Sequence, residues 1–189
     1  MTTAVLVPIK GFASAKGRLD GTLDAGQRSE LARNLAARVL AAAAPLPVTV
    51  VCDDDEVATF ARRHGAEVLV QREVGLNAAV TEGVEHLAAG GAERVLIAHA
   101  DLPRAKGLAA LASLAEATTS DAVVLVPDRH HDGTNVMVVP TGAGFHFAYG
   151  AGSFAAHRAE AERLGVAVVV VHDDDLAWDV DTAEDLAGL

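Results

Sequence analysis

The stretch Ala4-Val5-Leu6-Val7-Pro8-Ile9-Lys10 begins the sequence with an apolar run of strand length. It leads directly into Gly11-Phe12-Ala13-Ser14-Ala15-Lys16-Gly17-Arg18-Leu19, which combines small residues with cations. Small residues let the backbone approach an anion, and cations neutralise its charge. The stretch therefore predicts a first strand followed by a loop that is either a phosphate seat or an ordinary solvated turn. The loop matches neither the Walker pattern Gly-x-x-x-x-Gly-Lys-Ser/Thr nor Gly-x-Gly-x-x-Gly.

Several further segments resemble this first strand, Ala4–Pro8, in being almost continuously apolar. They are Val48–Cys52, Arg94–Ala98 and Ala122–Val126. Strands that are buried on both faces of a mainly parallel sheet have this composition. Strands with one solvent-exposed face instead alternate between apolar and polar residues. Additional strands are predicted at Glu67–Val70, Val136–Val139 and Ala167–Val171.

Helical patterns separate these strands along the whole chain. They cover Ala25–Ala44, Glu56–His64, a segment carrying Leu76, Val80, Val84 and Leu87, then Arg104–Ala115, Gly152–Leu164 and Thr182–Leu189. Asp24 and Gln27 have the spacing of a capping box at the start of the first helix. The alternation predicts an α/β fold of three layers with a mainly parallel sheet, and the absence of a linker or repeat predicts a single domain over residues 1–189.

The composition limits the kinds of partner that the protein can have. The chain has 189 residues, 51% of them hydrophobic, and a formal net charge of -11. This acidic balance argues against binding to duplex nucleic acid, but a local basic loop with a metal ion can still hold a nucleotide. The single cysteine, Cys52, excludes an internal disulfide and is expected to be a small buried apolar residue.

The sequence also predicts where the protein works. No apolar stretch reaches the roughly 20 residues that a membrane-spanning helix needs. The start, Met1-Thr2-Thr3-Ala4, lacks the pattern of a secretion signal. We therefore expect a cytoplasmic protein with no membrane partner. The apolar-rich composition is compatible with a homodimer but does not decide the oligomeric state.

Candidate metal ligands follow the predicted strands at the ends where ligands bind in such sheets. Asp101 lies just past the strand Arg94–Ala98, and Asp179 lies near the end of the chain. Mg²⁺ is commonly held by one or two carboxylates together with substrate phosphates, which makes these two residues candidate ligands. A helix cap is the alternative for Asp101. For Asp181, directly before the last predicted helix, the cap is the favoured interpretation.

Other polar clusters carry weaker signals. Asp53–Asp55 and Asp173–Asp175 are expected to be solvated turns. His130-His131 with Asp132 has ligand types that suit zinc, but no third ligand is evident and a zinc site is disfavoured. Gly133-Thr134-Asn135 and Gly150-Ala151-Gly152-Ser153 are candidate anion sites, with Ser153 either a helix N-cap or part of an anion seat. Asn77 is expected either to cap a helix or to contact a ligand.

Taken in order, these segments resemble the guanylyltransferases that activate 2-phospho-L-lactate or phosphoenolpyruvate in the biosynthesis of the deazaflavin coenzyme factor 420. Their fold is the Rossmann-like, glycosyltransferase-A type of nucleotidyltransferase. The resemblance spans nearly the whole chain. It rests on Val7-Pro8-Ile9-Lys10, Ser14–Leu19, Leu76-Asn77-Ala78-Ala79, Ala100-Asp101-Leu102-Pro103, Asp128-Arg129, Gly133-Thr134-Asn135, Tyr149–Ser153 with His157, and Asp179–Leu186.

The resemblance implies substrates, a cofactor and a role for each site residue. The substrates are GTP and a small phosphorylated three-carbon acid, and pyrophosphate is released. The implied nucleotide-binding residues are Lys10, Ser14, Lys16, Arg18 and Asn77. Lys16, Arg18 and Asp101 are the implied catalytic residues, with Asp101 and Asp179 as ligands of Mg²⁺. The implied acceptor-binding residues are Thr134, Gly150 and Ser153.

The sequence does not decide the identity of the acceptor or how it is held, and it allows two alternative functions. The chain departs from the family around Arg129–Asp132, so the way in which the acceptor's carboxylate is held is undecided. The residues do not select between phosphoenolpyruvate and 2-phospho-L-lactate. One alternative is a molybdenum-cofactor nucleotidyltransferase, but Pro8-Ile9-Lys10 replaces its Leu-Ala-Gly-Gly loop. Another is a catalytically silent nucleotide- or sugar-phosphate-binding regulator, which the presence of both aspartates disfavours.

Overall fold

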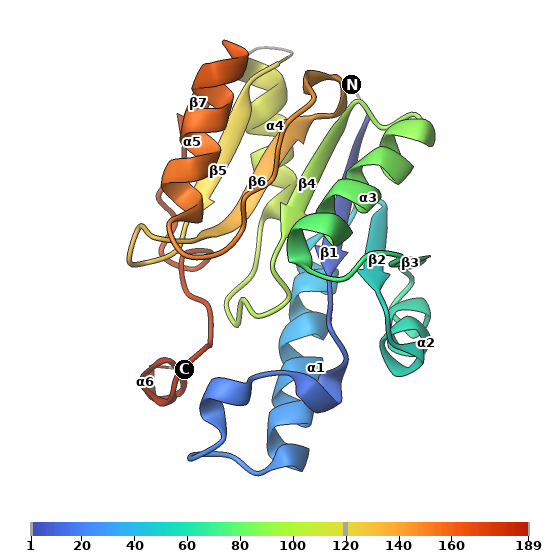
Figure 1. Ribbon diagram of the computed structural model, residues 1–189, viewed down its shortest axis with the longest axis vertical. Helices are drawn as coiled ribbons and strands as arrows, with labels where there is room; N and C mark the ends of the chain where they lie inside the picture. The colour runs from blue at the N-terminus through green and yellow to red at the C-terminus, as the bar shows by residue number, and fades with distance from the viewer. Residues whose placement is uncertain (1, 119–120, 189) are drawn as a thin grey trace.

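A computed structural model describes residues 2–118 and 121–188 (Figure 1). Within them a seven-stranded sheet has the order β3-β2-β1-β4-β6-β5-β7. The strands are β1 (Thr3–Pro8), β2 (Val48–Cys52), β3 (Glu67–Val70), β4 (Arg94–Ala98), β5 (Val123–Pro127), β6 (Thr134–Pro140) and β7 (Val168–Val170). All neighbouring strands pair in parallel except at β6, which is antiparallel to both β4 and β5. The predicted mainly parallel sheet is confirmed.

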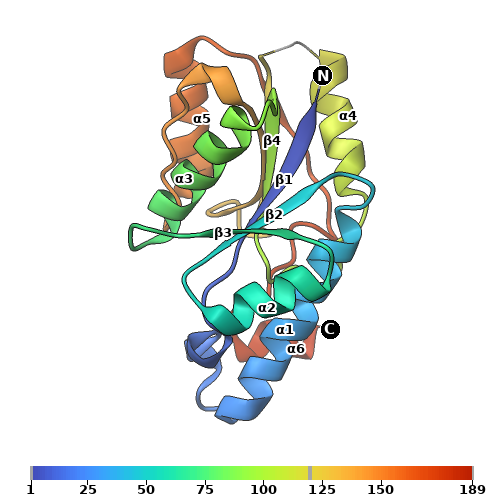
Figure 2. The same cartoon turned by 90° about the vertical axis from the view of Figure 1, so that its right-hand side faces the viewer.

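Helices cover both faces of the sheet, so the predicted three layers are present (Figure 2). Helices α3 (Leu76–Ala89) and α5 (Ser153–Leu164) lie on one face. Helices α1 (Ala25–Ala42), α2 (Asp55–Arg63) and α4 (Leu108–Thr118) lie on the other. A short helix α6 (Ala183–Ala187) follows β7, and the 3₁₀ turns are η1 (Phe12–Ser14), η2 (Gly17–Leu19) and η3 (Thr141–Ala143).

The apolar strands form the core, as their composition predicts. Val5, Leu96 and Val124 are completely buried and pack in the cluster under α1, α2 and α4. Leu6, Ile97 and Leu125 are equally buried and pack in the cluster under α3 and α5. Successive residues of a strand point to opposite faces, and both faces are covered, so the strands read as continuous apolar runs. Cys52 is buried, as predicted.

Helix boundaries agree with the sequence at the start of α1 and differ at several other helix ends. The capping box of Asp24 and Gln27 is confirmed at the start of α1. Helix α4 begins at Leu108, not at Arg104, because the chain turns through Gly107 with a φ of 65° first. The last predicted helix runs only over Ala183–Ala187, and its predicted end at Leu189 lies outside the described residues. None of the described helices is long and apolar enough to cross a membrane.

Candidate active site

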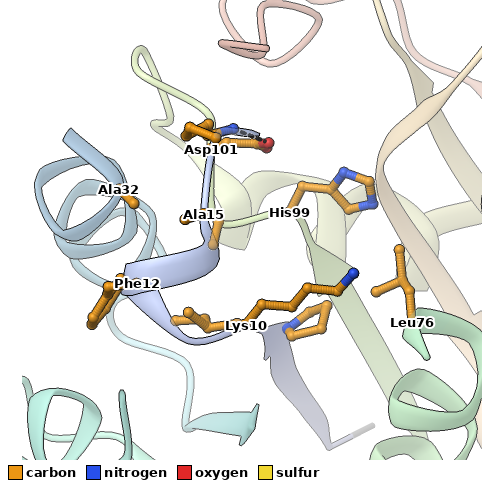
Figure 3. A pocket seen from close by; sticks show the side chains of 11 residues that line it. Lys10, Phe12, Ala15, Ala32, Leu76, His99 and Asp101 are labelled. Atoms are coloured by element: carbon orange, nitrogen blue, oxygen red, sulfur yellow. Dashed lines mark hydrogen bonds and ion pairs between the residues drawn. The ribbon is translucent and has the colours of Figure 1, made fainter. Parts of the chain in front are cut away.

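The carboxyl ends of β1 and β4 border a crevice between the opening loop and the segment after β4 (Figure 3). Its lining residues are Pro8, Ile9, Lys10, Phe12, Ala15, Lys16, Ala32, Leu76, His99, Ala100 and Asp101. A second hollow adjoins the crevice and shares Pro8, Ile9, Lys10 and Leu76 with it. The opening loop therefore lies at the edge of the sheet where this class of fold binds ligands.

Lys16 links the opening loop to the acidic side of the crevice. Its ammonium group donates to Asp101 Oδ2 at 2.7 Å and to Asp181 Oδ1 at 3.3 Å, and its side chain is only 9% exposed. Burial works to lower the pKa of Lys16, but the two carboxylates outweigh it and raise the pKa overall. Lys16 has a φ of 57°, a conformation that is strained for a residue with a side chain. The strain and the ion pairs occur together at the centre of the candidate site.

Asp101 and Asp179 lie side by side although they are far apart in the sequence. The Val180 N–H donates to the Asp101 carbonyl at 3.2 Å, which joins the segment after β4 to the C-terminal segment. Asn135, at the start of β6, donates to Asp179 Oδ1 at 3.4 Å and to the Leu176 carbonyl at 3.0 Å. Asn135 thus orients one of the two aspartates, a role that the sequence did not reveal.

The two carboxylates have the electrostatics of a cation site. Burial raises the pKa of Asp179, and the nearby charges of Asp101 and Asp181 raise it further. Burial also works to raise the pKa of Asp101, but Lys16 outweighs it and the pKa is lowered overall. Asp101 Oδ1 is buried and has no hydrogen-bond partner among the residues that the structure describes. An orphaned carboxylate oxygen beside a second carboxylate fits a hard divalent cation, which takes oxygen ligands.

Asp181 belongs to this charged group and is not the helix cap that the sequence favoured. The N-cap of α6 is Thr182, which forms a capping box with Asp185. The Asp181 carboxylate instead accepts from Lys16 and, at 3.3 Å, from Arg18 Nη1. The cap alternative for Asp101 is also wrong, because α4 begins only at Leu108. Both carboxylates therefore face the opening loop.

A small apolar cluster holds the C-terminal segment against the opening loop. Leu19 from the loop, Leu35 from α1 and Val180 from the C-terminal segment are each at most 3% exposed and pack together. Figure 1 shows α6 and the opening loop together beyond the carboxyl ends of the strands. Arg129 pairs with Asp185 and stacks on Trp178, which fixes the same segment from the side of β5. This packing places Asp179 and Asp181 opposite Lys16.

Lys10 and Ser14 are the other loop residues in the predicted nucleotide set. Lys10 is exposed, and its side chain extends across the crevice toward Leu76 and His99 (Figure 3). Ser14 is exposed and its hydroxyl donates to the Gly11 carbonyl at 2.9 Å. An exposed lysine on a loop, such as Lys10, can extend to bind an anion that enters the crevice.

The three predicted acceptor residues lie together on the α5 side of β6. Thr134 is 1% exposed, Ser153 is 2% exposed, and Gly150 is exposed in the loop before α5 with a φ of 135°. The N-cap of α5 is Gly152, and no side-chain cap bond is present, so the N-cap alternative for Ser153 is wrong. None of the three is among the described residues that line the two hollows.

Asn77 and His157 hold the loop that carries Gly150. Asn77 Oδ1 accepts from the Tyr149 N–H at 2.7 Å, and Asn77 Nδ2 donates to the Tyr149 carbonyl at 3.2 Å. His157 Nε2 accepts from the Ala148 N–H at 3.1 Å. Gly75, not Asn77, is the N-cap of α3. Both polar ends of the Asn77 amide are therefore engaged by the loop backbone, and its predicted contact with a nucleotide stays a prediction.

The loop between β5 and β6 shows how the remaining candidate clusters are used. Asp128 accepts from the N–H groups of His130, Asp132 and Gly133, so it closes the loop internally. The Asp132 carbonyl accepts from the Phe154 N–H at 3.0 Å and covers the start of α5. Within residues 2–118 and 121–188, no group of three or more His, Cys, Asp and Glu residues is arranged to hold a metal ion.

The run Asp173–Asp175 forms a turn, as predicted, whereas Asp53–Asp55 leads into α2, whose first residue is Asp55. Asp54 is the N-cap of α2, where its carboxylate accepts from two backbone N–H groups. Asp173 accepts from the N–H groups of Asp175 and Leu176. These carboxylates satisfy local backbone donors and lie outside the crevice lining.

Two solved structures share the fold of this chain. A suggested nucleotide-diphospho-sugar transferase from Desulfovibrio desulfuricans G20 superposes with a TM-score of 0.79 at 17% identity, covering 98% of this chain and 85% of its own. A CMP:2-keto-3-deoxy-manno-octonic acid synthetase complexed with CTP has a TM-score of 0.64 at 13% identity, covering 100% and 96%. At these identities the likeness establishes the fold, which is that of nucleotidyltransferases.

Sequence comparison gives the family. The model of the family "Guanylyl transferase CofC like" matches residues 3–189, and the chain belongs to this family. A phosphoenolpyruvate guanylyltransferase of Conexibacter woesei is 38% identical, covering 100% of this chain and 87% of its own length. Enzymes of the same name from Sphaerobacter thermophilus and Streptomyces coelicolor are each 36% identical, covering 100% and 98% of this chain and 93% and 89% of theirs.

Proposed function

We propose that this protein transfers GMP from GTP to the phosphate of phosphoenolpyruvate and releases pyrophosphate, in the biosynthesis of the deazaflavin coenzyme that the sequence resemblance implies. The observation that carries the proposal is the buried ammonium of Lys16, held between Asp101 and Asp181 at the mouth of the crevice. Family membership and the names of the relatives support the choice of GTP and phosphoenolpyruvate. Residues 1–189 would act as one nucleotidyltransferase domain.

The reaction joins an acceptor phosphate oxygen to the α-phosphorus of GTP as the bond to pyrophosphate breaks. A phosphate monoester is largely ionised at neutral pH, so the chain needs no base to deprotonate the nucleophile. Its residues have to position the two substrates and neutralise charge. Lys10, Ser14 and Arg18 would receive the triphosphate, and Lys16 and Arg18 would stabilise the departing pyrophosphate.

Asp101 and Asp179 would hold Mg²⁺, because Asp101 Oδ1 is an unused buried acceptor beside a second carboxylate. When bound there, the ion supplies charge neutralisation to the reacting phosphates. Thr134, Gly150 and Ser153 would bind the phosphate of the acceptor from the α5 side of the sheet. Asn135 would keep Asp179 in place through the bond between their side chains.

Pyrophosphate release with GTP and one of three acceptors tests the proposal. Phosphoenolpyruvate, 2-phospho-L-lactate and 3-phosphoglycerate are compared at equal concentrations, with and without Mg²⁺. We expect turnover with phosphoenolpyruvate to exceed turnover with the other two and to require the metal. Turnover with none of the three would contradict the proposed function. The solution mass checks the homodimer that the composition allows.

A further inference from the structure

His157 is a fully buried histidine to which no role has been assigned. It lies in the first half of α5 and is 0% exposed. Its Nδ1 lies 3.0 Å from the Thr134 hydroxyl oxygen, and its Nε2 lies 3.1 Å from the Ala148 backbone nitrogen. The ring of Tyr149 packs edge-on against it with centroids 4.8 Å apart. One side chain therefore contacts both segments that carry the acceptor residues.

The hydrogen-bond partners fix the tautomer of this ring. A backbone N–H can only donate, so Nε2 must be the unprotonated nitrogen that accepts from Ala148. Burial, with the nearby charge of His99, lowers the pKa of His157 to about 4, so the ring is neutral at neutral pH. In a neutral imidazole the single proton is then on Nδ1, which donates to the Thr134 hydroxyl.

This tautomer determines what the Thr134 hydroxyl can do. Its oxygen accepts from Nδ1–H, so its own hydrogen cannot point back to His157. Within the described residues the hydroxyl has no other hydrogen-bond partner. A buried hydroxyl whose hydrogen makes no hydrogen bond within the protein is suited to donate to an anion. The opposite tautomer would make Thr134 donate to His157 and leave nothing for a ligand.

The same ring also holds the backbone that leads to Gly150. The N–H of Ala148 is bound by His157, and the N–H and carbonyl of Tyr149 are bound by Asn77. Three polar groups of the two residues before Gly150 are thus fixed by side chains from α5 and α3. Gly150 follows directly, with a φ of 135° that glycine adopts readily, so the bonds to Ala148 and Tyr149 fix the backbone that leads into it.

We propose that His157 is a positioning residue of the acceptor site, which orients the Thr134 hydroxyl hydrogen toward the acceptor's anionic phosphate and fixes the loop that presents Gly150. The inference rests on the proposed function, since it deepens the same acceptor site. It makes a neutral, Nδ1-protonated histidine a requirement for binding the three-carbon phosphate but not for binding GTP.

The tautomer is tested on the full-length protein without substrates. Long-range proton–nitrogen correlation spectra of ¹⁵N-histidine-labelled protein at pH 7 distinguish the two neutral forms. We expect His157 to be protonated at Nδ1, with its signals identified by their loss in His157→Gln. Protonation at Nε2 overturns the proposal. Because this spectrum needs no turnover, it decides the tautomer even if the assay for guanylyl transfer gives no product and the proposed function fails.

The consequence for binding is tested by a double-mutant cycle between His157 and Thr134. His157→Gln and Thr134→Val should each raise the KM for phosphoenolpyruvate about tenfold, the effect of one lost hydrogen bond to a charged group, with the KM for GTP changed less than about twofold. The double variant should be no worse than the more affected single variant, because each single variant breaks the same contact. A double variant with the product of both defects overturns the proposal.

Comparing two replacements of His157 distinguishes a positioning role from a role in packing alone. His157→Asn retains an amide donor near the position of Nδ1, so it should restore part of the acceptor affinity that His157→Gln loses. Equal losses in the two variants, or equal rises in the KM of both substrates, would assign His157 to packing alone. His86→Asn, in the exposed last turn of α3, is the matched control. If His157 variants do not fold, the His157 signals are identified instead by their shift in Thr134→Val, which removes the hydroxyl that His157 contacts, so the tautomer is still decided.

Discussion

The two sides of the candidate site are built from different interactions. We call the loop Lys10–Leu19 with Asp101, Asp179 and Asp181 the nucleotide half, and Thr134 with residues 148–153 and His157 the acceptor half. The nucleotide half is held by ion pairs, which range from the largely buried pair of Lys16 with Asp101 to the exposed pair of Arg18 with Asp181, whose side chains are 77% and 41% exposed. The acceptor half is held by neutral hydrogen bonds around a histidine that is completely buried.

The difference follows from what each half has to bind. The exposed pair of Arg18 with Asp181 contributes little to stability, so an incoming phosphate can replace it at small cost. Buried neutral groups are costly to leave unpaired, so their partners have to be in place before the ligand arrives. We infer that the nucleotide half rearranges its charges on binding, whereas the acceptor half is formed in advance.

The largest effect is expected from removing the charge at the centre of the nucleotide half. Asp101→Asn keeps the size of the side chain but deprives Lys16 and a cation of a carboxylate. It should abolish Mg²⁺-dependent pyrophosphate release, with a loss of at least about 10²-fold, while the fold stays intact by circular dichroism. Asp174→Asn, in the exposed acidic run, is the matched control. Near-normal turnover of Asp101→Asn would remove the metal assignment.

Acidification should change the charge of a key residue in the acceptor half but not in the nucleotide half. The pKa of His157 is lowered from 6.5 to about 4, so below pH 6.5 the unfolded chain binds a proton that the folded chain does not. The free energy of unfolding should therefore fall by about 3 kcal/mol between pH 7 and pH 4 through this group. Lys16 holds the pKa of Asp101 low, so that carboxylate keeps its charge over the same range.

Urea unfolding of the wild type and His157→Gln at several pH values measures this term. The difference in stability between the two proteins should shrink as the pH falls. Parallel pH profiles would show that His157 is not kept neutral by the fold, and would weaken the contrast between the two halves.

The sequence predicted local features and missed contacts between segments that are far apart in the chain. Apolar strands and the residues directly after them are local features, which is why β4 and Asp101 could be predicted. Asp181 was misassigned as a cap, because its partner Lys16 is 165 residues away and the two meet through tertiary packing such as that of Val180 on Leu19. The direction of β6 was not predicted either. It follows from the short loop Asp128–Gly133, since such a loop joins antiparallel strands.

Asn77 lies at the border between the halves and can be assigned by kinetics. Asn77→Leu removes both hydrogen bonds to the Tyr149 backbone and frees the loop before Gly150. We expect the KM for phosphoenolpyruvate to rise about tenfold, with a smaller effect on the KM for GTP. A rise confined to the KM for GTP would instead support the nucleotide contact that the resemblance implies. Thr81→Ala, one turn further along α3, is the control.

The smallest effect is expected at Ser153, and it tests whether the acceptor half is formed in advance. Its hydroxyl caps no helix, so Ser153→Ala should change the free energy of unfolding by less than about 0.5 kcal/mol, below the usual cost of losing an N-cap. The KM for the acceptor should still rise a few-fold, and more than the KM for GTP, because only the ligand uses this hydroxyl. Equal rises for both substrates would contradict its placement in the acceptor half. A loss of stability of about 1 kcal/mol or more would mean that Ser153 supports α5 and that the hydroxyl is not reserved for the ligand.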